Sequence, residues 1–232
     1  MLRIIRTGAA RGTLGPTFVA FLVVGIAYDT NVPAVQAELR GRDFTPTVDS
    51  GFGAMARALP GAPEPTLPPD RRLGRATEFL AFLAEEVRPF VEERYEVAEE
   101  SSVLFGSSLG GLLVLHALLE RPEAFDAYLA ASPAIWWDER RLLRRERELA
   151  ASREDIDATL FLAVGAGEER EDLPVLAPFR MVSNLRDLAD GLRARGYPSL
   201  DMTTLEAEGE SHTTVVPVAL TRGLRYIFRS PS

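Results

Sequence analysis

A serine framed by glycines is the feature of this chain whose residue types and spacing most suggest chemistry. The stretch GSSLG over 106–110 places Ser108 in a Gly-x-Ser-x-Gly frame, after an apolar run and before a segment with helical spacing. A serine on a sharp strand-to-helix turn is exposed for nucleophilic attack, and the next backbone N–H, that of Leu109, faces the developing oxyanion. The frame predicts Ser108 as a nucleophile and the Leu109 N–H as an oxyanion donor. A tight turn without chemistry is the alternative.

A serine hydroxyl needs a base to accept its proton, and the chain has two histidines. His116 lies in the helix predicted to begin at the serine turn, so its side chain cannot return to the hydroxyl, and we interpret it as structural. His212 lies between the last predicted strand and the last predicted helix, on a loop at the carboxyl edge of the sheet. We predict His212 as the base. A solvent-exposed loop histidine without a role is the alternative.

A carboxylate that orients the histidine is the third group such chemistry needs. In the chain order serine, acid, histidine, the acid follows a strand between the other two. The predicted strand 158–165 ends in GAGEERED, which offers Glu168 as the first choice, Glu169 as the second and Asp172 as the third. Acidic loop residues are often only solvated, so the choice among the three stays open.

The elements that must position these groups alternate along the chain. Apolar runs predict strands at 17–28, 102–105, 127–132, 158–165 and 199–206. Helical spacing predicts helices over 72–94 with a kink at Pro89, and over 109–120, 138–152, 179–196 and 214–229. The alternation predicts one α/β domain over 1–232, with a mostly parallel sheet covered by helices on both faces. Gly and Pro residues over 41–70 predict a long surface loop.

Composition excludes several classes of protein. The net charge of −8 argues against nucleic acid as a partner, and the absence of cysteine excludes disulfides, thiol catalysis and cysteine-ligated metals. No stretch reaches the ~18 consecutive apolar residues of a membrane span. Arginines precede the apolar run over 18–28, as in a signal peptide, but no small-residue cleavage site follows. A buried strand is therefore favoured, and the predicted location is cytoplasmic.

Several stretches resemble the esterase branch of the α/β-hydrolases, which includes esterase D-like enzymes and the esterases that open the trilactone of catecholate siderophores. They are, in order, VVGIAY, RGRDFTP, RPFVEERYEV, GSSLGGLLVLHALLERPEAF, AYLAASPAIWWD and EGESHTTVVPVALTRGLRYIF. The resemblance implies an α/β-hydrolase fold and a serine esterase without metal or cofactor. It implies Ser108 as nucleophile, His212 as base and a glutamate near 168 as acid. The implied substrate is a small-molecule ester: a siderophore lactone, or another aromatic or short acyl ester.

Two further features are candidates for substrate binding. RGRDFTP follows the first predicted strand, so we expect Arg42 near the carboxyl edge of the sheet, where it could hold an anionic or catechol-bearing group. Pairing with Asp43 is the alternative. Trp136 and Trp137 follow a strand and suggest a flat apolar wall, or core cover with only one ring reaching the substrate.

The N-terminus departs from this pattern. Members of the branch have further strands before VVGIAY and a turn there that supplies a second oxyanion donor, and residues 1–17 contain no such turn. One oxyanion donor can be worth roughly 3–4 kcal/mol of transition-state stabilisation. The sequence therefore predicts an N-terminally shortened fold with an exposed sheet edge. A truncated start, a homodimer that covers this edge and a loss of activity are the competing explanations. An acyltransferase of the same fold and a catalytically silent binding protein are the alternative functions.

Overall fold

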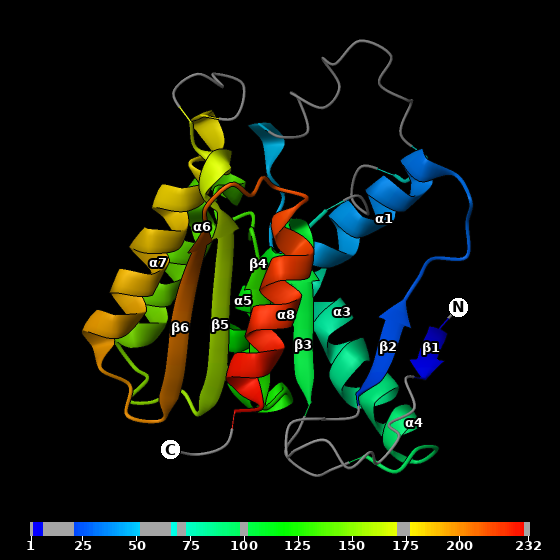
Figure 1. The fold of residues 1–232 in the computed structure, drawn as a ribbon. Helices are drawn as coiled ribbons and strands as arrows, with labels where there is room; N and C mark the ends of the chain where they lie inside the picture. The colour runs from blue at the N-terminus through cyan, green and yellow to red at the C-terminus, as the bar shows by residue number, and fades with distance from the viewer. Residues whose placement is uncertain are drawn as a thin grey trace.

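A sheet of four parallel strands is at the centre of the structure, a computed structural model that describes residues 2–6, 21–51, 66–68, 73–97, 102–170 and 177–229. The strands, in their spatial order, are β3 (Val103–Ser107), β4 (Ala127–Ala131), β5 (Ala158–Gly165) and β6 (Leu200–Ala207). Their parallel pairing brings all four carboxyl ends to one edge (Figure 1). The loops after β3, β5 and β6, which contain the three predicted catalytic residues, therefore share this edge.

Helices cover both faces of this sheet. On one face α8 (Val215–Ile227) lies against β4 and β5 (Figure 1). On the other face lie α5 (Leu109–Glu120) and α7 (Met181–Arg195), and α6 (Trp137–Ala150) contacts both of these helices. The predicted elements after residue 100 match these within a few residues. The prediction of an α/β fold with a parallel sheet covered on both faces is confirmed.

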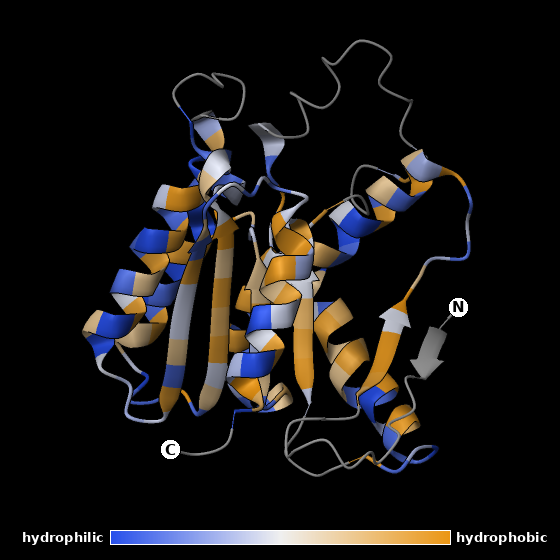
Figure 2. Ribbon diagram, in the orientation of Figure 1, coloured by the Kyte–Doolittle hydropathy of each residue, from blue (hydrophilic) through white to orange (hydrophobic). Residues whose placement is uncertain are grey.

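The central strand β4 and the helix α5 appear as uninterrupted apolar runs in the sequence because they are buried along their length. All five residues of β4 are buried, and α5 buries ten consecutive residues from Gly110 to Leu119. A helix that is apolar on every side belongs in a core. By contrast, α7 alternates in hydropathy along its length (Figure 2), because it buries its leucines and leaves its charged residues exposed. Of the two elements beside the serine turn, α5 is thus enclosed by packing, whereas β3 is only partly buried and its Phe105 is 38% exposed.

None of the described helices is both long and apolar enough to cross a membrane.

The N-terminal strands form a separate antiparallel pair, β1 (Leu2–Arg6) with β2 (Leu22–Ile26). Among the described residues, neither strand pairs with the four-stranded sheet. The strand expected over 17–28 is present as β2, and residues 17–20 lie outside the described residues. The expectation that it is buried on both faces is wrong, because Val23 and Ile26 are 48% and 39% exposed. Within the described structure β2 pairs only with β1, outside the four-stranded sheet, and none of its five residues is fully buried.

The segment between β2 and β3 contains two differences from the expected elements. The surface loop expected over 41–70 starts later than predicted, because α1 (Pro33–Phe44) includes residues 41–44 of it. Pro33 favours the start of this helix, and Thr45 ends it in an extended conformation. Residues 52–65 and 69–70 of the expected loop lie outside the described residues. The helix expected over 72–94 is α3 (Ala76–Phe82), a π-helical turn (Leu83–Val87) and α4 (Arg88–Glu92). The π turn ends at Val87, two residues before Pro89, so the helix is locally widened close to the position of the expected kink.

Candidate active site

Ser108 lies in a sharp turn between β3 and α5. Its backbone angles are φ 59° and ψ −119°, which residues with a Cβ rarely adopt. Neighbouring backbone holds the turn from both sides: the Ser108 N–H donates to the Ala131 carbonyl at 3.0 Å, and the Ala134 N–H donates to the Ser108 carbonyl at 3.1 Å. Leu109 is the first residue of α5, and N–H groups in a first turn have no acceptor within their own helix. The geometry is that of a nucleophile elbow with a backbone donor beside it.

Two glycines near Ser108 are required by close approaches of the backbone. A Cβ at Gly106 would lie 2.2 Å from the carbonyl oxygen of Gly110, and a Cβ at Gly111 would lie 2.9 Å from the Pro133 Cα. A Cβ at Gly110 would meet no atom within 4 Å. The tightness of the turn therefore depends on Gly106 and Gly111, although Gly110 completes the sequence frame.

We expect Gly106→Ala and Gly110→Ala to have opposite effects on stability. The Cβ at Gly106 meets backbone that cannot move aside, and overpacking of this kind costs about 1–3 kcal/mol or more. Alanine at Gly110 meets open space in a helix, where it is favoured over glycine by roughly 0.5–1 kcal/mol. Urea unfolding of both variants beside the wild type measures the two free energies. A Gly106→Ala protein as stable as the wild type would contradict the close approach.

A histidine and a buried carboxylate meet at the same sheet edge. His212 Nδ1 lies 2.6 Å from Glu168 Oε2, and the Glu168 side chain is only 2% exposed, against 42% for His212. The other carboxylate oxygen, Oε1, accepts the Gly165 N–H at 2.8 Å and the Ser132 hydroxyl at 2.5 Å. A carboxylate held this way accepts a hydrogen bond from the Nδ1–H of His212, which leaves Nε2 available to accept a proton.

The loop that bears His212 folds back across the end of β5. It follows β6 and enters α8, which lies on β4 and β5, so the chain runs toward the serine turn (Figure 1). The Gly167 N–H donates to the Glu210 carbonyl at 3.0 Å, and a Cβ at Gly165 would lie 2.6 Å from that carbonyl oxygen. The absence of a side chain at Gly165 thus lets the loop pass close to the end of β5, which places His212 away from β6, the strand that it follows.

The other two candidate acids differ from Glu168. The Glu169 carboxylate accepts the backbone N–H of Ser183 at 2.6 Å and the Ser183 hydroxyl at 2.5 Å. It therefore stabilises the first turn of α7, where a negative charge is favourable, and does not meet His212. Asp172 lies outside the described residues.

Ser108 and His212 lie on loops at one edge of the sheet, and among the described residues no hydrogen bond joins their side chains. Hydrogen bonds between a nucleophile and its base are often long without substrate and shorten in the complex. The structure thus unites His212 with Glu168, and it presents Ser108 separately on its strained turn.

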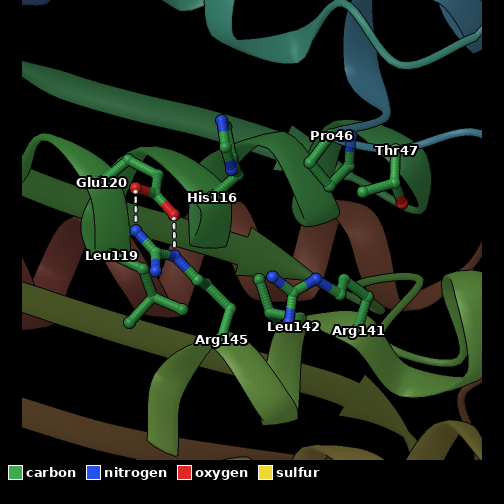
Figure 3. A pocket seen from close by; sticks show the side chains of 8 residues that line it. All are labelled: Pro46, Thr47, His116, Leu119, Glu120, Arg141, Leu142 and Arg145. Carbon is green, nitrogen blue, oxygen red and sulfur yellow. Dashed lines mark hydrogen bonds and ion pairs between the residues drawn. The ribbon is translucent and has the colours of Figure 1, made fainter. Parts of the chain in front are cut away.

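His116 lies away from this edge, buried in α5. Its Nε2 is 3.1 Å from the Thr77 hydroxyl. His116, Glu120 and Arg145 line a pocket of about 140 Å³, in which the imidazole ring points away from the ion pair between the other two (Figure 3). Burial lowers the pKa of His116 below its ordinary value of 6.5; the charge of Glu120 opposes this effect and that of Arg145 adds to it. These contacts agree with the structural role expected from its position in the sequence.

The lowered pKa of His116 predicts an acid-sensitive contribution to stability. Below pH 6.5 the unfolded chain binds the imidazole proton more readily than the folded chain does. The neutral His116 side chain therefore contributes fully to the free energy of unfolding above its unfolded pKa. This contribution is lost as the pH falls from the unfolded pKa through the lower pKa of the folded protein. We expect His116→Gln, which can still hydrogen-bond to Thr77, to show a shallower fall of Tm between about pH 7 and about pH 5. Calorimetry across this range measures both slopes, and equal slopes would contradict the prediction.

Arg42 is paired with its neighbour in the chain. Its guanidinium donates to both carboxylate oxygens of Asp43, at 2.6 and 2.8 Å, and the Tyr28 hydroxyl donates to the same carboxylate at 2.9 Å. Asp43 is buried, so this cluster braces the end of α1. The pairing considered as the alternative from the sequence is present, and a substrate role for Arg42 stays a prediction.

The two adjacent tryptophans have different surroundings at the start of α6. Trp137 is 1% exposed and its indole N–H donates to the Thr47 carbonyl at 3.1 Å. Trp136 is half-buried and packs on Phe179 with ring centroids 4.7 Å apart. The partly accessible aromatic surface therefore belongs to Trp136 and Phe179. Nothing in the sequence singles out Phe179, because only the fold brings residues so far apart in the chain together.

The family of the chain follows from sequence comparison. The model of the Esterase family, described as "Putative esterase", matches residues 64–199. The chain belongs to this family, a class of carboxylic ester hydrolases with the α/β-hydrolase fold.

Individual relatives include the ferri-bacillibactin esterase BesA of Bacillus subtilis, 32% identical over 88% of this chain and 66% of that protein. A siderophore enterobactin esterase of Emericella nidulans is 33% identical over 91% of this chain and 73% of that protein. The chain thus spans about two thirds of the length of the Bacillus relative.

Two solved structures agree with the fold. The BES protein from Bacillus cereus has a TM-score of 0.69 at 33% identity, over 90% of this chain and 70% of that one. The siderophore hydrolase EstA from Aspergillus nidulans has a TM-score of 0.70 at 32% identity, over 89% of this chain and 71% of that one. The expectation of an α/β-hydrolase fold is confirmed.

Proposed function

We propose that this protein is a serine esterase that cleaves a carboxylic ester with Ser108, His212 and Glu168. The observation that supports this most strongly is the 2.6 Å contact between His212 Nδ1 and the buried Glu168 carboxylate, at the sheet edge where the strained Ser108 turn also lies. A paired imidazole and a serine on an elbow are the groups that acyl transfer requires.

In the proposed mechanism, Ser108 Oγ attacks the ester carbonyl carbon while His212 Nε2 accepts the hydroxyl proton. The Leu109 N–H donates a hydrogen bond to the oxyanion of the tetrahedral intermediate. Collapse of the intermediate breaks the ester C–O bond, and His212 gives its proton to the leaving alkoxide. Water then repeats the sequence on the acyl-serine and releases the acid. Glu168 accepts the hydrogen bond of the imidazolium and stabilises its charge in both halves of the reaction.

We propose a siderophore ester as the substrate class. The relatives from Bacillus subtilis and Emericella nidulans are named as a ferri-bacillibactin esterase and a siderophore enterobactin esterase. The partly accessible Trp136 and Phe179 rings offer an aromatic surface on which an aromatic acyl group can pack.

Mass spectrometry of the products tests the activity and the substrate class together. The purified chain is incubated with a cyclic trilactone siderophore bearing catechol groups and, separately, with p-nitrophenyl acetate; Ser108→Ala is the control. We expect the linear, water-added siderophore with the wild type only. Hydrolysis of the simple ester alone would overturn the substrate class, and no hydrolysis of either ester by the folded chain would overturn the esterase. Ester products in the presence of an added alcohol would indicate acyl transfer instead.

A further inference from the structure

We propose that Ser132 is a positioning residue that holds Glu168 in the orientation His212 needs, an inference that rests on the proposed function. The Ser132 hydroxyl donates to Glu168 Oε1 at 2.5 Å, and the two residues are 0% and 2% exposed. A hydroxyl buried this completely has a structural or functional partner, and here that partner is the carboxylate itself.

The hydrogen bonds of Glu168 divide its two oxygens between scaffold and base. Among the described residues, Oε1 accepts from the Ser132 hydroxyl and from the Gly165 N–H at 2.8 Å, whereas Oε2 faces His212 Nδ1. Gly165 is only three residues away and belongs to the same strand end, so it follows Glu168 when that segment moves. Ser132 directly follows β4, so its hydroxyl is the donor that connects the carboxylate to a different strand. Without it the carboxylate can rotate and lose its alignment with the imidazole.

The backbone of Ser132 connects the acid to the nucleophile. Ser132 has φ 43°, unusual for a residue other than glycine, and its N–H donates to the Ala163 carbonyl of β5 at 2.7 Å. On either side of it, the Ala131 carbonyl and the Ala134 N–H bond to the backbone of Ser108 at 3.0 and 3.1 Å. A strained residue maintained by such contacts is typical of functional sites. The turn after β4 therefore sets the position of Glu168 relative to the serine turn.

The chain contains a matched control for this role. The Ser183 hydroxyl donates a hydrogen bond to Glu169, the residue after Glu168, at 2.5 Å. This is the same kind of serine-to-glutamate contact, but Glu169 does not meet His212. Removal of the Ser183 hydroxyl tests the loss of a serine–carboxylate bond near the site without a change at the imidazole.

Steady-state kinetics on Ser132→Ala, Ser132→Gly and Ser183→Ala test the proposal. We expect both Ser132 variants to lose roughly 10- to 100-fold in kcat with KM within about twofold, the size expected for a hydrogen bond to a charged group. Glycine relaxes the positive φ and alanine does not, so equal losses attribute the effect to the hydroxyl. Ser183→Ala should stay within about twofold of the wild type. In the Glu168→Ala background, Ser132→Ala should cause no further loss, because the two act as one unit.

A second readout does not need turnover. A proton shared in a short bond between imidazole and carboxylate resonates far downfield in the NMR spectrum, and we expect this His212 Nδ1 signal in the wild type and in Ser183→Ala but weakened in Ser132→Ala. An unchanged signal together with full activity in Ser132→Ala, or a loss that multiplies with that of Glu168→Ala, would overturn the proposal. If the wild type hydrolyses no ester, the proposed function fails, and the signal alone then decides the role of Ser132.

Discussion

Ser108→Ala is expected to lower kcat for ester hydrolysis by about 10⁶-fold, with little change in KM, because the acyl-serine can no longer form. His212→Ala should cause a loss of similar size, since the hydroxyl then has no base. The double variant should be no worse than either single one, because nucleophile and base act as a unit. Saturation kinetics on a chromogenic ester measure these values for the folded, purified proteins.

The neighbouring serine provides the control for this prediction. Ser107 is the last residue of β3 and adjoins Ser108 in the GSSLG frame, but it lies on the strand and not on the turn with φ 59°. Ser107→Ala should retain kcat within a few fold of the wild type. A Ser108→Ala protein with a tenth or more of wild-type activity, or an equal loss in Ser107→Ala, would show that Ser108 is not the nucleophile.

Glu168→Gln is expected to lower kcat by roughly 10⁴-fold while the chain stays folded. The amide has nearly the shape of the carboxylate, but it carries no charge to stabilise the imidazolium, and its NH₂ group can favour the wrong tautomer of His212. The loss should appear in kcat and in kcat/KM equally, because the interaction is made chiefly in the transition state.

Glu169→Gln is the matched control, since Glu169 bonds to Ser183 at the start of α7 and not to His212. It should change kcat by no more than a few fold. If Glu169→Gln were the damaging substitution and Glu168→Gln the mild one, the acid assigned from the 2.6 Å contact would be the wrong carboxylate.

Much of the central fold could be predicted from the sequence because burial there is continuous. The helix 109–120 and the strand 158–165 have the predicted bounds, since glycines and turn residues frame uninterrupted apolar runs. The region around α1 could not be predicted as well. Gly41 and Arg42 look like turn residues, but one is buried in the last turn of a helix and the other is paired with Asp43.

The site could be predicted only to the level of its loops. The positions of Ser108 and His212 after strands follow from the alternation of elements, whereas the distinction between Glu168 and Glu169 depends on which carboxylate the crossing loop meets. Ser132 lies in the stretch LAASPAIWWD, but neither its positive φ nor its contact with Glu168, 36 residues away, leaves a signal in a single sequence. Both arise from tertiary packing.

The central claim, that Ser108 is activated by His212, is tested most directly by intact-mass spectrometry after incubation with a fluorophosphonate. We predict one phosphonyl adduct on the wild type, assigned to Ser108 by peptide mapping, and none on Ser108→Ala. His212→Ala should react at least about 10³-fold more slowly, because the hydroxyl is a poor nucleophile without its base. A folded wild-type chain that forms no adduct, or an adduct that persists in Ser108→Ala, would contradict the assignment of this turn as an active nucleophile.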